Sequence, residues 1–358
     1  MVGQICSTED SRFIYVVGTA HSPTGSDFQL DFGAGVTLPE AGGSYDGEQS
    51  AAFLVKYNKR SLQPQWARGQ TSGSVIAQST GRACSVDSTN GDIVIAGTYR
   101  MEDTVAATRF EGSGNIVSLE LTNGFDPYVC RYSEDGTVER CWRARGPALE
   151  DPMRMETGID EVVDVITEPI ANFEDRIVVL GYSTNSDIAF FSGVSLSFSS
   201  TPATWVVRYN HAGVTLQAEQ YYPAVGTGLP NKLAFDTIEL FYWVCGTTAA
   251  NEPWLLQLDG NSLFEFSNTA FGVNAGMGTC NGVTVGSDSA VAIVGQMTDG
   301  LDTNTGGQWD AAGFGAYILR MDRLGTVEHL SFFDSTCLTI GTCRSDCVML
   351  VLVPVCVV

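Results

Sequence analysis

The feature that most constrains the fold of this chain is a short strand-like word that occurs five times. Each copy begins with an aromatic residue, continues with apolar residues around one basic or amide side chain, and ends at a turn residue. The copies are 53–58 (FLVKYN), 128–133 (YVCRYS), 205–210 (WVVRYN), 254–259 (WLLQLD) and 317–322 (YILRMD). A turn follows each copy, with Gly136, Gly213, Gly260 and Gly325 at four of the turns, and then another strand-like segment. Each copy therefore predicts the first strand of a β-hairpin.

A second repeated word precedes every hairpin and consists of an apolar run that ends in glycine. These glycines are Gly18, Gly97, Gly181, Gly246 and Gly295. A weaker strand-like segment precedes each apolar run, so every unit carries four predicted strands in a constant order. The units differ mainly in the loop between the second and third strands, where insertions are tolerated. We expect the glycine to permit close packing or a bulge at the end of the second strand.

Repetition of one four-stranded antiparallel unit predicts an all-β fold, a β-propeller with five clear blades and a partial sixth. The blades are expected at 1–70, 77–146, 159–223, 231–271 and 278–335, within a single domain of residues 1–358. Residues 336–358 repeat the start of the fifth unit and read as a partial blade or a strand-donating tail. Two β-sandwiches are the alternative, but they give no reason for the constant strand order. Closure with five blades, or with a sixth completed by another chain, stays open.

Several of these words resemble a known family. The segment 31–43 (DFGAGVTLPEAGG), followed by AAFLVKYN and Trp66, resembles the bacterial SBBP-type beta-propeller repeat, and 126–142 (DPYVCRYSEDGTVERCW) is similar to it. The resemblance spans about residues 11–334, although the fourth unit lacks the DF-containing loop. It implies a secreted or surface propeller that serves as a binding or structural scaffold, with no shared catalytic residues to carry over.

The net charge of the chain and its apolar segments make some classes of binding partner unfavourable. The 358 residues include 41 acidic and 19 basic side chains, which gives a formal net charge of −22. Nucleic acids and anionic membrane surfaces would be repelled. The apolar segment 348–358 is shorter than the roughly 20 residues of a spanning helix and contains Pro354, so we expect a strand there rather than membrane insertion. Residues 1–10 do not read as a signal peptide, and the ends are consistent with a piece of a longer polypeptide.

Ten cysteines are present, and no two form a CxxC pair of the zinc-finger type. If 135–136 is a two-residue turn, the hairpin register places Cys130 opposite Cys141, within reach of a disulfide. Two buried thiols are the alternative there. Pairs are also expected within the set Cys337, Cys343, Cys347, Cys356 and Cys6, with their connectivity open. Cys245 reads as a buried core thiol. Disulfides would place the protein outside the cell or at the cell surface.

The sequence carries no catalytic signature. His21, His211 and His329 lie in separate units and read as solvated side chains, and no nucleophile elbow or nucleotide-binding loop occurs. The loop with Asp299, Asp302 and Asn304 imitates the oxygen spacing of a calcium site but lacks the distal glutamate, so a solvated turn is the alternative. No cofactor other than calcium is indicated.

We therefore expect a non-enzymatic extracellular scaffold that binds proteins, by self-association or within a larger assembly. It would be a module or subunit of a surface appendage or filament. One alternative is a propeller that binds calcium or carbohydrate. A polysaccharide-cleaving enzyme that uses a pair of carboxylates is the other.

Overall fold

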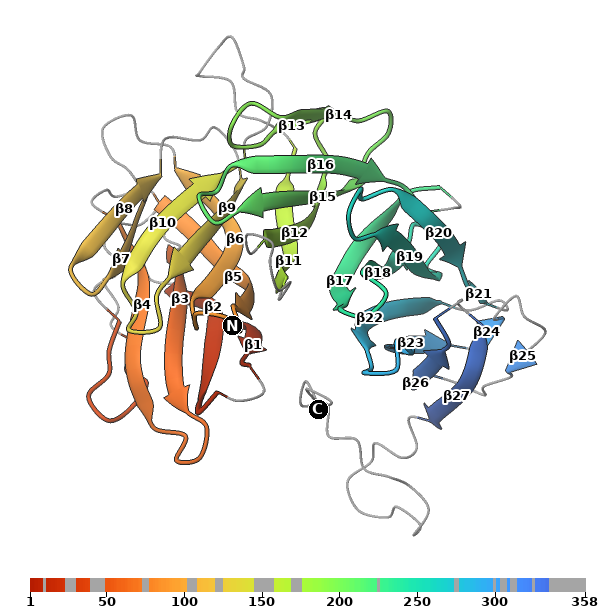
Figure 1. The fold of residues 1–358 in the computed structure, drawn as a ribbon, viewed down its shortest axis with the longest axis horizontal. Helices are drawn as coiled ribbons and strands as arrows, with labels where there is room; N and C mark the ends of the chain where they lie inside the picture. The colour runs from red at the N-terminus through yellow and green to blue at the C-terminus, as the bar shows by residue number, and fades with distance from the viewer. Residues whose placement is uncertain are drawn as a thin grey trace. The chain divides into compact units, whose positions relative to one another are not determined.

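The computed structural model describes an all-β chain (Figure 1). The described residues are 1–8, 11–22, 30–38, 49–72, 77–101, 108–119, 125–144, 158–168, 176–223, 226–273, 277–298, 301–302, 308–309, 314–323 and 326–334. They belong to two compact units, Met1–Gln220 and Tyr221–Val358. Within these residues there is no helix with the length and apolarity that crossing a bilayer requires.

The first unit contains three main sheets, numbered here in chain order. The first sheet contains β1 (Val2–Cys6), β2 (Phe13–Ser22), β3 (Gln49–Asn58) and β4 (Pro64–Ser72). The second contains β5 (Ala77–Val86), β6 (Ile93–Met101), β9 (Asp126–Tyr132) and β10 (Val138–Arg143). The third contains β11 (Asp160–Glu168), β12 (Arg176–Ser183), β15 (Ala203–Asn210) and β16 (Thr215–Tyr221), the last of which ends at the boundary.

The second unit contains two main sheets. The fourth sheet contains β17 (Gly228–Asp236), β18 (Phe241–Thr248), β19 (Pro253–Asp259) and β20 (Glu265–Ala270). The fifth contains β22 (Gly278–Val285), β23 (Val291–Thr298), β26 (Phe314–Met321) and β27 (Val327–Asp334). A small sheet contains β21 (Gly272–Val273), β24 (Leu301–Asp302) and β25 (Gln308–Trp309).

The predicted fold class, all-β with repeated four-stranded antiparallel sheets, is confirmed. In each main sheet the four strands follow one another in chain order, as in a propeller blade. The single domain of residues 1–358 stays a prediction. The proposed sixth blade also stays one, because residues 335–358 lie outside the described part of the chain.

The repeated glycine has one structural role in all five sheets. It is the register partner of the aromatic residue that opens the repeated word in the third strand, in the pairs Gly18–Phe53, Gly97–Tyr128, Gly181–Trp205, Gly246–Trp254 and Gly295–Tyr317. All five aromatic side chains are buried. On its other side the glycine faces a register shift in the first strand. The five words therefore lie in equivalent surroundings, and the expected bulge and close packing are both present.

Two hairpins come from the variable loops and were not predicted. The hairpin of β7 (Thr108–Gly112) and β8 (Asn115–Leu119) lies in the sequence between β6 and β9 of the second sheet. It nevertheless pairs with β4, which extends the first sheet to six strands. The hairpin of β13 (Asp187–Ala189) and β14 (Ser195–Ser197) follows β12. Its Ile188 and Phe190 are buried in the core of the third sheet.

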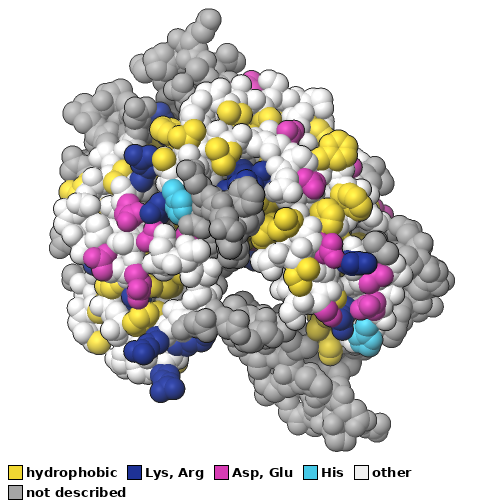
Figure 2. Space-filling view, in the orientation of Figure 1, with side chains coloured by type: hydrophobic (Ala, Val, Ile, Leu, Met, Phe, Trp, Pro, Cys, Tyr) yellow, Lys and Arg dark blue, Asp and Glu magenta, His cyan; other side chains and the backbone are white. Residues whose placement is uncertain are grey.

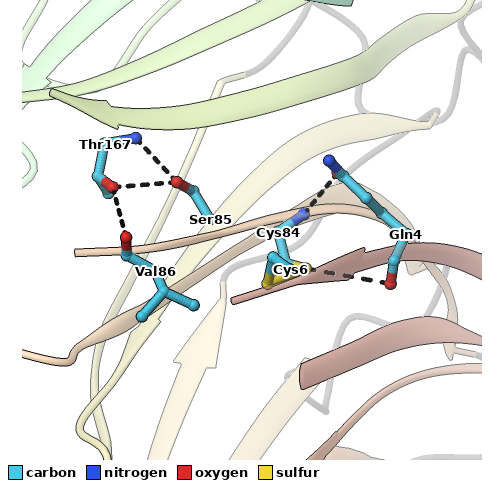
Figure 3. Close-up of a disulfide and its surroundings, with 6 residues drawn as sticks. All are labelled: Gln4, Cys6, Cys84, Ser85, Val86 and Thr167. Atoms are coloured by element: carbon cyan, nitrogen blue, oxygen red, sulfur yellow. Dashed lines mark hydrogen bonds between the residues drawn. A yellow bond between two sulfur atoms is a disulfide. The ribbon is translucent and has the colours of Figure 1, made fainter. Parts of the chain in front are cut away.

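The first strands of the three sheets in the first unit are joined in series (Figure 3). Cys6 of β1 forms a disulfide with Cys84 of β5, and Gln4 accepts a hydrogen bond from the Cys84 backbone N–H at 2.9 Å. Thr167 of β11 donates its hydroxyl to the Val86 carbonyl at 3.1 Å and its backbone N–H to Ser85 Oγ at 3.0 Å. Covalent and hydrogen bonds thus connect neighbouring sheets as well as strands.

This arrangement corrects one expectation and agrees with another. Cys6 is bonded to Cys84, not to a cysteine of the C-terminal segment, because packing of the first two sheets brings β1 and β5 together. Cys130 is bonded to Cys141, as the hairpin register predicts. Cys245 is buried, as expected, and so is Cys280. The disulfide candidates Cys337, Cys343, Cys347 and Cys356 lie outside the described residues.

Candidate protein-binding surface

The predicted calcium loop falls mostly outside the described residues. Asp299 and Asn304 are not described, and Asp302 is known only from its backbone, which pairs with Gly272 and Gln308. Among the described side chains, no group of three or more histidine, cysteine or acidic residues could hold a metal ion. The calcium site stays a prediction.

The three histidines belong to different sheets: His21 is in β2, His211 is in the turn between β15 and β16, and His329 is in β27. His21 and His329 are exposed. His211, expected to be solvated, is instead partly buried, and its Nδ1 lies 2.8 Å from the Arg131 guanidinium. The same guanidinium donates to the His211 carbonyl at 3.3 Å, so this contact holds the turn of the third sheet against the second. The role of His211 is therefore structural.

The basic residue of the repeated word forms ion pairs that sequence reasoning missed. Arg131 contacts Asp92 at 2.7 Å and Glu139 at 2.9 Å, and Arg320 contacts Asp288 at 2.6 Å. At the corresponding place in the first sheet, buried Lys56 donates to the Glu134 carboxylate at 3.1 Å, which joins the first and second sheets. Each of these carboxylates is thus paired with the basic residue of a repeated word.

Buried Glu168 repeats this pattern in the third sheet. Its carboxylate lies 3.4 Å from Arg208 Nε and 3.8 Å from an Arg176 amino group. Burial raises the pKa of Glu168, and the two guanidinium groups partly oppose that shift. The carboxylate is buried and its two partners are the guanidinium groups of the same sheet, so Glu168 is part of the core of the third sheet.

One open depression lies beside the added β7–β8 hairpin. It measures about 390 Å³ and is lined by Arg68, Glu111, Ser113, Asn115 and Ile116, among others. Arg68 already donates from Nε to the Gly136 carbonyl and from a terminal nitrogen to the Ala67 carbonyl, both at 2.9 Å. Its guanidinium is thus engaged in joining the first two sheets, and Glu111 is the other charged side chain in the lining.

The outward side chains at the start of each fourth strand show a difference between the sheets. In each main sheet, the last residue of the repeated word donates its backbone N–H to a carbonyl at or just before the start of the fourth strand. This shared hydrogen bond makes five pairs of positions equivalent. These pairs are Gln63 and Gln65, Thr137 and Glu139, Val214 and Leu216, Phe264 and Phe266, and Thr326 and Glu328. Three pairs are polar and two are apolar, so the fold does not require apolar side chains here.

In the third sheet, Val214 and Leu216 are 40% and 50% exposed, and Phe191 of the β13–β14 hairpin is 47% exposed. Thr215 lies between them and holds the hairpin in place. It donates its N–H to Ser192 Oγ at 3.1 Å and its hydroxyl to the Phe191 carbonyl. We call Phe191, Val214 and Leu216 the third-sheet patch.

In the fourth sheet, Phe264 is 73% exposed and Phe266 is 63% exposed. The Phe266 ring lies 5.2 Å from the ring of Phe241, which is partly buried against the core. We call Phe264 and Phe266 the fourth-sheet patch; apolar side chains are visible at the surface over this part of the second unit (Figure 2). Taken by itself, this segment does not mark the two phenylalanines as exposed, because an alternating strand normally buries its apolar side.

The fourth-sheet patch lies at the outermost strand of its sheet. The strand order is β17, β18, β19, β20, and β20 forms its ladder with β19. In the first sheet the corresponding strand, β4, pairs with β7 as well, from Gly69–Glu111 to Ser72–Thr108.

Comparison with known proteins gives no family. No protein-family model matches the chain, and no curated protein matches it in sequence. Among solved structures it is similar to the Dos1 propeller, with a TM-score of 0.42, 9% identity, and coverage of 93% of this chain and 83% of that one. It is also similar to PpgL, the periplasmic gluconolactonase of Pseudomonas aeruginosa, with a TM-score of 0.38, 11% identity, and coverage of 92% and 87%.

Proposed function

We propose that this chain is a non-enzymatic scaffold of propeller blades that binds other proteins through the fourth strands of its third and fourth sheets. One observation carries the proposal: at equivalent positions, two sheets expose apolar pairs where three sheets carry polar ones. An aromatic side chain buries about 150–250 Å² when it is covered, so two exposed phenylalanines favour association. Clustered exposed apolar side chains are typical of protein-binding surfaces.

We further propose that the protein works outside the cell or at the cell surface, as a module or subunit of an appendage, filament or similar assembly. The two disulfides support an oxidising compartment, since such bonds are rare in the cytosol. The proposed relation to SBBP-type repeats, which rests on the short sequence words described above, fits the same location.

Replacing the fourth-sheet patch tests the proposed function. Phe264→Thr with Phe266→Glu installs the residues that the fifth sheet carries at equivalent positions, so the strand should still form. The immobilised double variant should retain at least tenfold less of the partners that the unchanged chain captures from the native extracellular fraction, measured by quantitative mass spectrometry. Val214→Thr with Leu216→Glu should lose those partners that bind the third sheet.

Gln63→Thr with Gln65→Glu is the matched control, because it places the same two residues on the first sheet, which has no apolar pair there. Its captured proteins should equal those of the unchanged chain. If both patch variants also retained every partner at unchanged levels, these surfaces would not be the binding sites and the proposal would be wrong.

Thiol accessibility tests the proposed location. In protein isolated without reductant, a thiol reagent should leave Cys6, Cys84, Cys130 and Cys141 unlabelled even after unfolding, and should label them once a reductant is added. The buried free thiol of Cys280 should be labelled on unfolding alone. Peptide mapping distinguishes the two groups. Labelling of all four paired cysteines before reduction would contradict an extracellular location.

A further inference from the structure

We infer that copies of this chain associate head to tail. In this contact, the turn of residues 59–62 in one copy, which lies between β3 and β4 and which we call the first-sheet turn, docks on the fifth sheet of a second copy beside Arg320. The inference rests on the proposed role as a subunit of an assembly and deepens it by naming the partner and the two surfaces that meet. It extends a contact that the first unit already makes twice between its own sheets.

Within the first unit, the turn between the third and fourth strands of one sheet docks on the preceding sheet. Lys56 of the first sheet donates to the Glu134 carbonyl at 3.0 Å, and Arg131 of the second sheet donates to the His211 carbonyl at 3.3 Å. Glu134 and His211 each directly follow the last residue of a repeated word, so the two contacts are equivalent. The basic residue of the word therefore holds the turn of the next sheet.

Docking covers both sides of this contact. The Lys56 side chain is 8% exposed and the Arg131 side chain is 18% exposed. Gly136 and Gly213, which lie in the two docked turns, are buried. An exposed turn, or an exposed basic residue at this position of the word, therefore marks a surface on which such a contact can still form.

The first-sheet turn is exposed throughout, from Lys59 to Leu62. Leu62 is 64% exposed, whereas Leu263, which has the same backbone hydrogen bond and a similar positive φ in the fourth-sheet turn, is 1% exposed. Neither Lys59 nor Arg60 forms an ion pair with any described residue. Basic side chains gather on the surface over this end of the β3–β4 hairpin (Figure 2). The turn thus presents a leucine and two cations to a partner.

The fifth sheet presents the other half of the contact. Arg320 has the same position in its repeated word as Lys56 and Arg131, but its side chain is 48% exposed. It is paired with Asp288 at 2.6 Å and with Glu328 at 3.3 Å, and both carboxylates are exposed. Arg131 is likewise paired with two carboxylates and still donates to a docked turn, so these pairs leave Arg320 able to bind one. We call Arg320, Asp288 and Glu328 the fifth-sheet cluster.

The charges of the two surfaces are complementary. The fifth-sheet cluster contains one cation and two carboxylates, so its net charge is −1. Lys59 follows its word as Glu134 and His211 follow theirs, so docking brings its carbonyl to Arg320 and its ammonium group to the carboxylates. In the first unit Lys56 obtains its carboxylate in the same way, from Glu134 of the docked turn at 3.1 Å. In both contacts the turn supplies the charge that neutralises the cluster.

The total charge of −22 on each copy opposes association at long range. At physiological salt, however, exposed charges are screened beyond about 8 Å, so the charges at the contact itself decide whether it forms. A second copy fits better than an unrelated protein, because a turn and a cluster of the same repeat match each other in backbone as well as in charge.

Each copy has one first-sheet turn and one fifth-sheet cluster, and these lie on different units. A contact between two copies uses one of each, so the remaining turn and cluster can bind further copies. A heterologous contact of this kind continues into a closed ring or an open filament. This agrees with the proposed role as a subunit of an assembly.

Sedimentation velocity of the full chain at physiological salt tests the inference. Between about 1 μM and about 1 mM, the unchanged chain should form species larger than one copy. Lys59→Glu places a carboxylate against the fifth-sheet cluster, and Glu328→Lys changes the net charge of that cluster to +1. Each substitution should raise the dissociation constant at least tenfold, because like charges then face each other. Glu219→Lys makes the same change as Glu328→Lys at an exposed position of the third sheet and should leave the dissociation constant unchanged.

Combining the two substitutions separates a direct contact from a general effect of charge. A chain that carries both Lys59→Glu and Glu328→Lys again has opposite charges on its turn and its cluster, so it should associate as the unchanged chain does. An equimolar mixture of the two single variants should associate as well, because each turn then meets a matched cluster on the other variant. The inference is wrong if the unchanged chain stays monomeric at every concentration, or if neither combination restores association.

This inference and the proposed function can fail separately, because the two patches share no residue with the first-sheet turn or the fifth-sheet cluster. If the patch variants lose their captured partners while the unchanged chain stays monomeric, the scaffold function stands and the head-to-tail contact is wrong. If copies associate as expected but both patch variants keep all captured partners, the head-to-tail contact is real and the patches are not the binding sites.

Discussion

Replacing Cys6 and Cys84 together with alanine is expected to lower the free energy of unfolding of the first unit by about 4–5 kcal/mol. The disulfide joins residues 78 positions apart, and a loop of that length loses much conformational entropy when it is closed in the unfolded chain. The bond also joins the first strands of two sheets. Urea unfolding of the full chain, compared with that of the unchanged protein, measures the change.

The second disulfide is the matched control. Cys130 and Cys141 are 11 positions apart on adjacent strands of one hairpin, so their replacement with alanine should cost less, about 3 kcal/mol. Both pairs lie in the same unit and leave no unpaired partner. If replacing Cys130 and Cys141 lowered the free energy of unfolding more than replacing Cys6 and Cys84 does, the length of the closed loop would not explain the two effects.

The two disulfides also show where sequence reasoning stops. The pairing of Cys130 with Cys141 follows from a local rule, because a two-residue turn fixes the register of the hairpin around it. The pairing of Cys6 with Cys84 depends on how two sheets pack, and no local rule gives that contact. The same limit hid the β7–β8 hairpin. Its sequence lies within the second repeat, which forms the second sheet, yet the hairpin pairs with the first sheet.

The candidate surface was harder to predict than the fold. The segment around Phe264 and Phe266 reads as an ordinary fourth strand, and apolar alternation predicts one buried face. Whether that face is covered depends on the neighbouring segments, which differ between sheets. In the second sheet the equivalent positions are Thr137 and Glu139, and a comparison of the five copies position by position would have found the difference.

The repeated glycine gives the second large effect. Gly295→Ala is expected to lower the free energy of unfolding of the second unit by about 3 kcal/mol, in the upper part of the usual range for overpacking. A Cβ atom at this position would overlap the Thr279 carbonyl oxygen and lie 2.7 Å from the Tyr317 ring. The ring cannot move away freely, because its hydroxyl donates to that carbonyl at 3.0 Å. Chemical denaturation of the full chain measures the loss.

Gly282→Ala is the matched control, since it makes the same change in the first strand of the same sheet. Among the described atoms, the added Cβ would contact Val294 Cγ2 alone, at 3.0 Å, and Val294 is 38% exposed and can shift. Alanine normally improves on glycine in a strand interior by roughly 0.5–1 kcal/mol, so this variant should be neutral or slightly more stable. If Gly295→Ala were equally well tolerated, close packing of the glycine against the aromatic residue would not explain the repeat. The five glycines would then need another cause, such as the bulge in the facing strand.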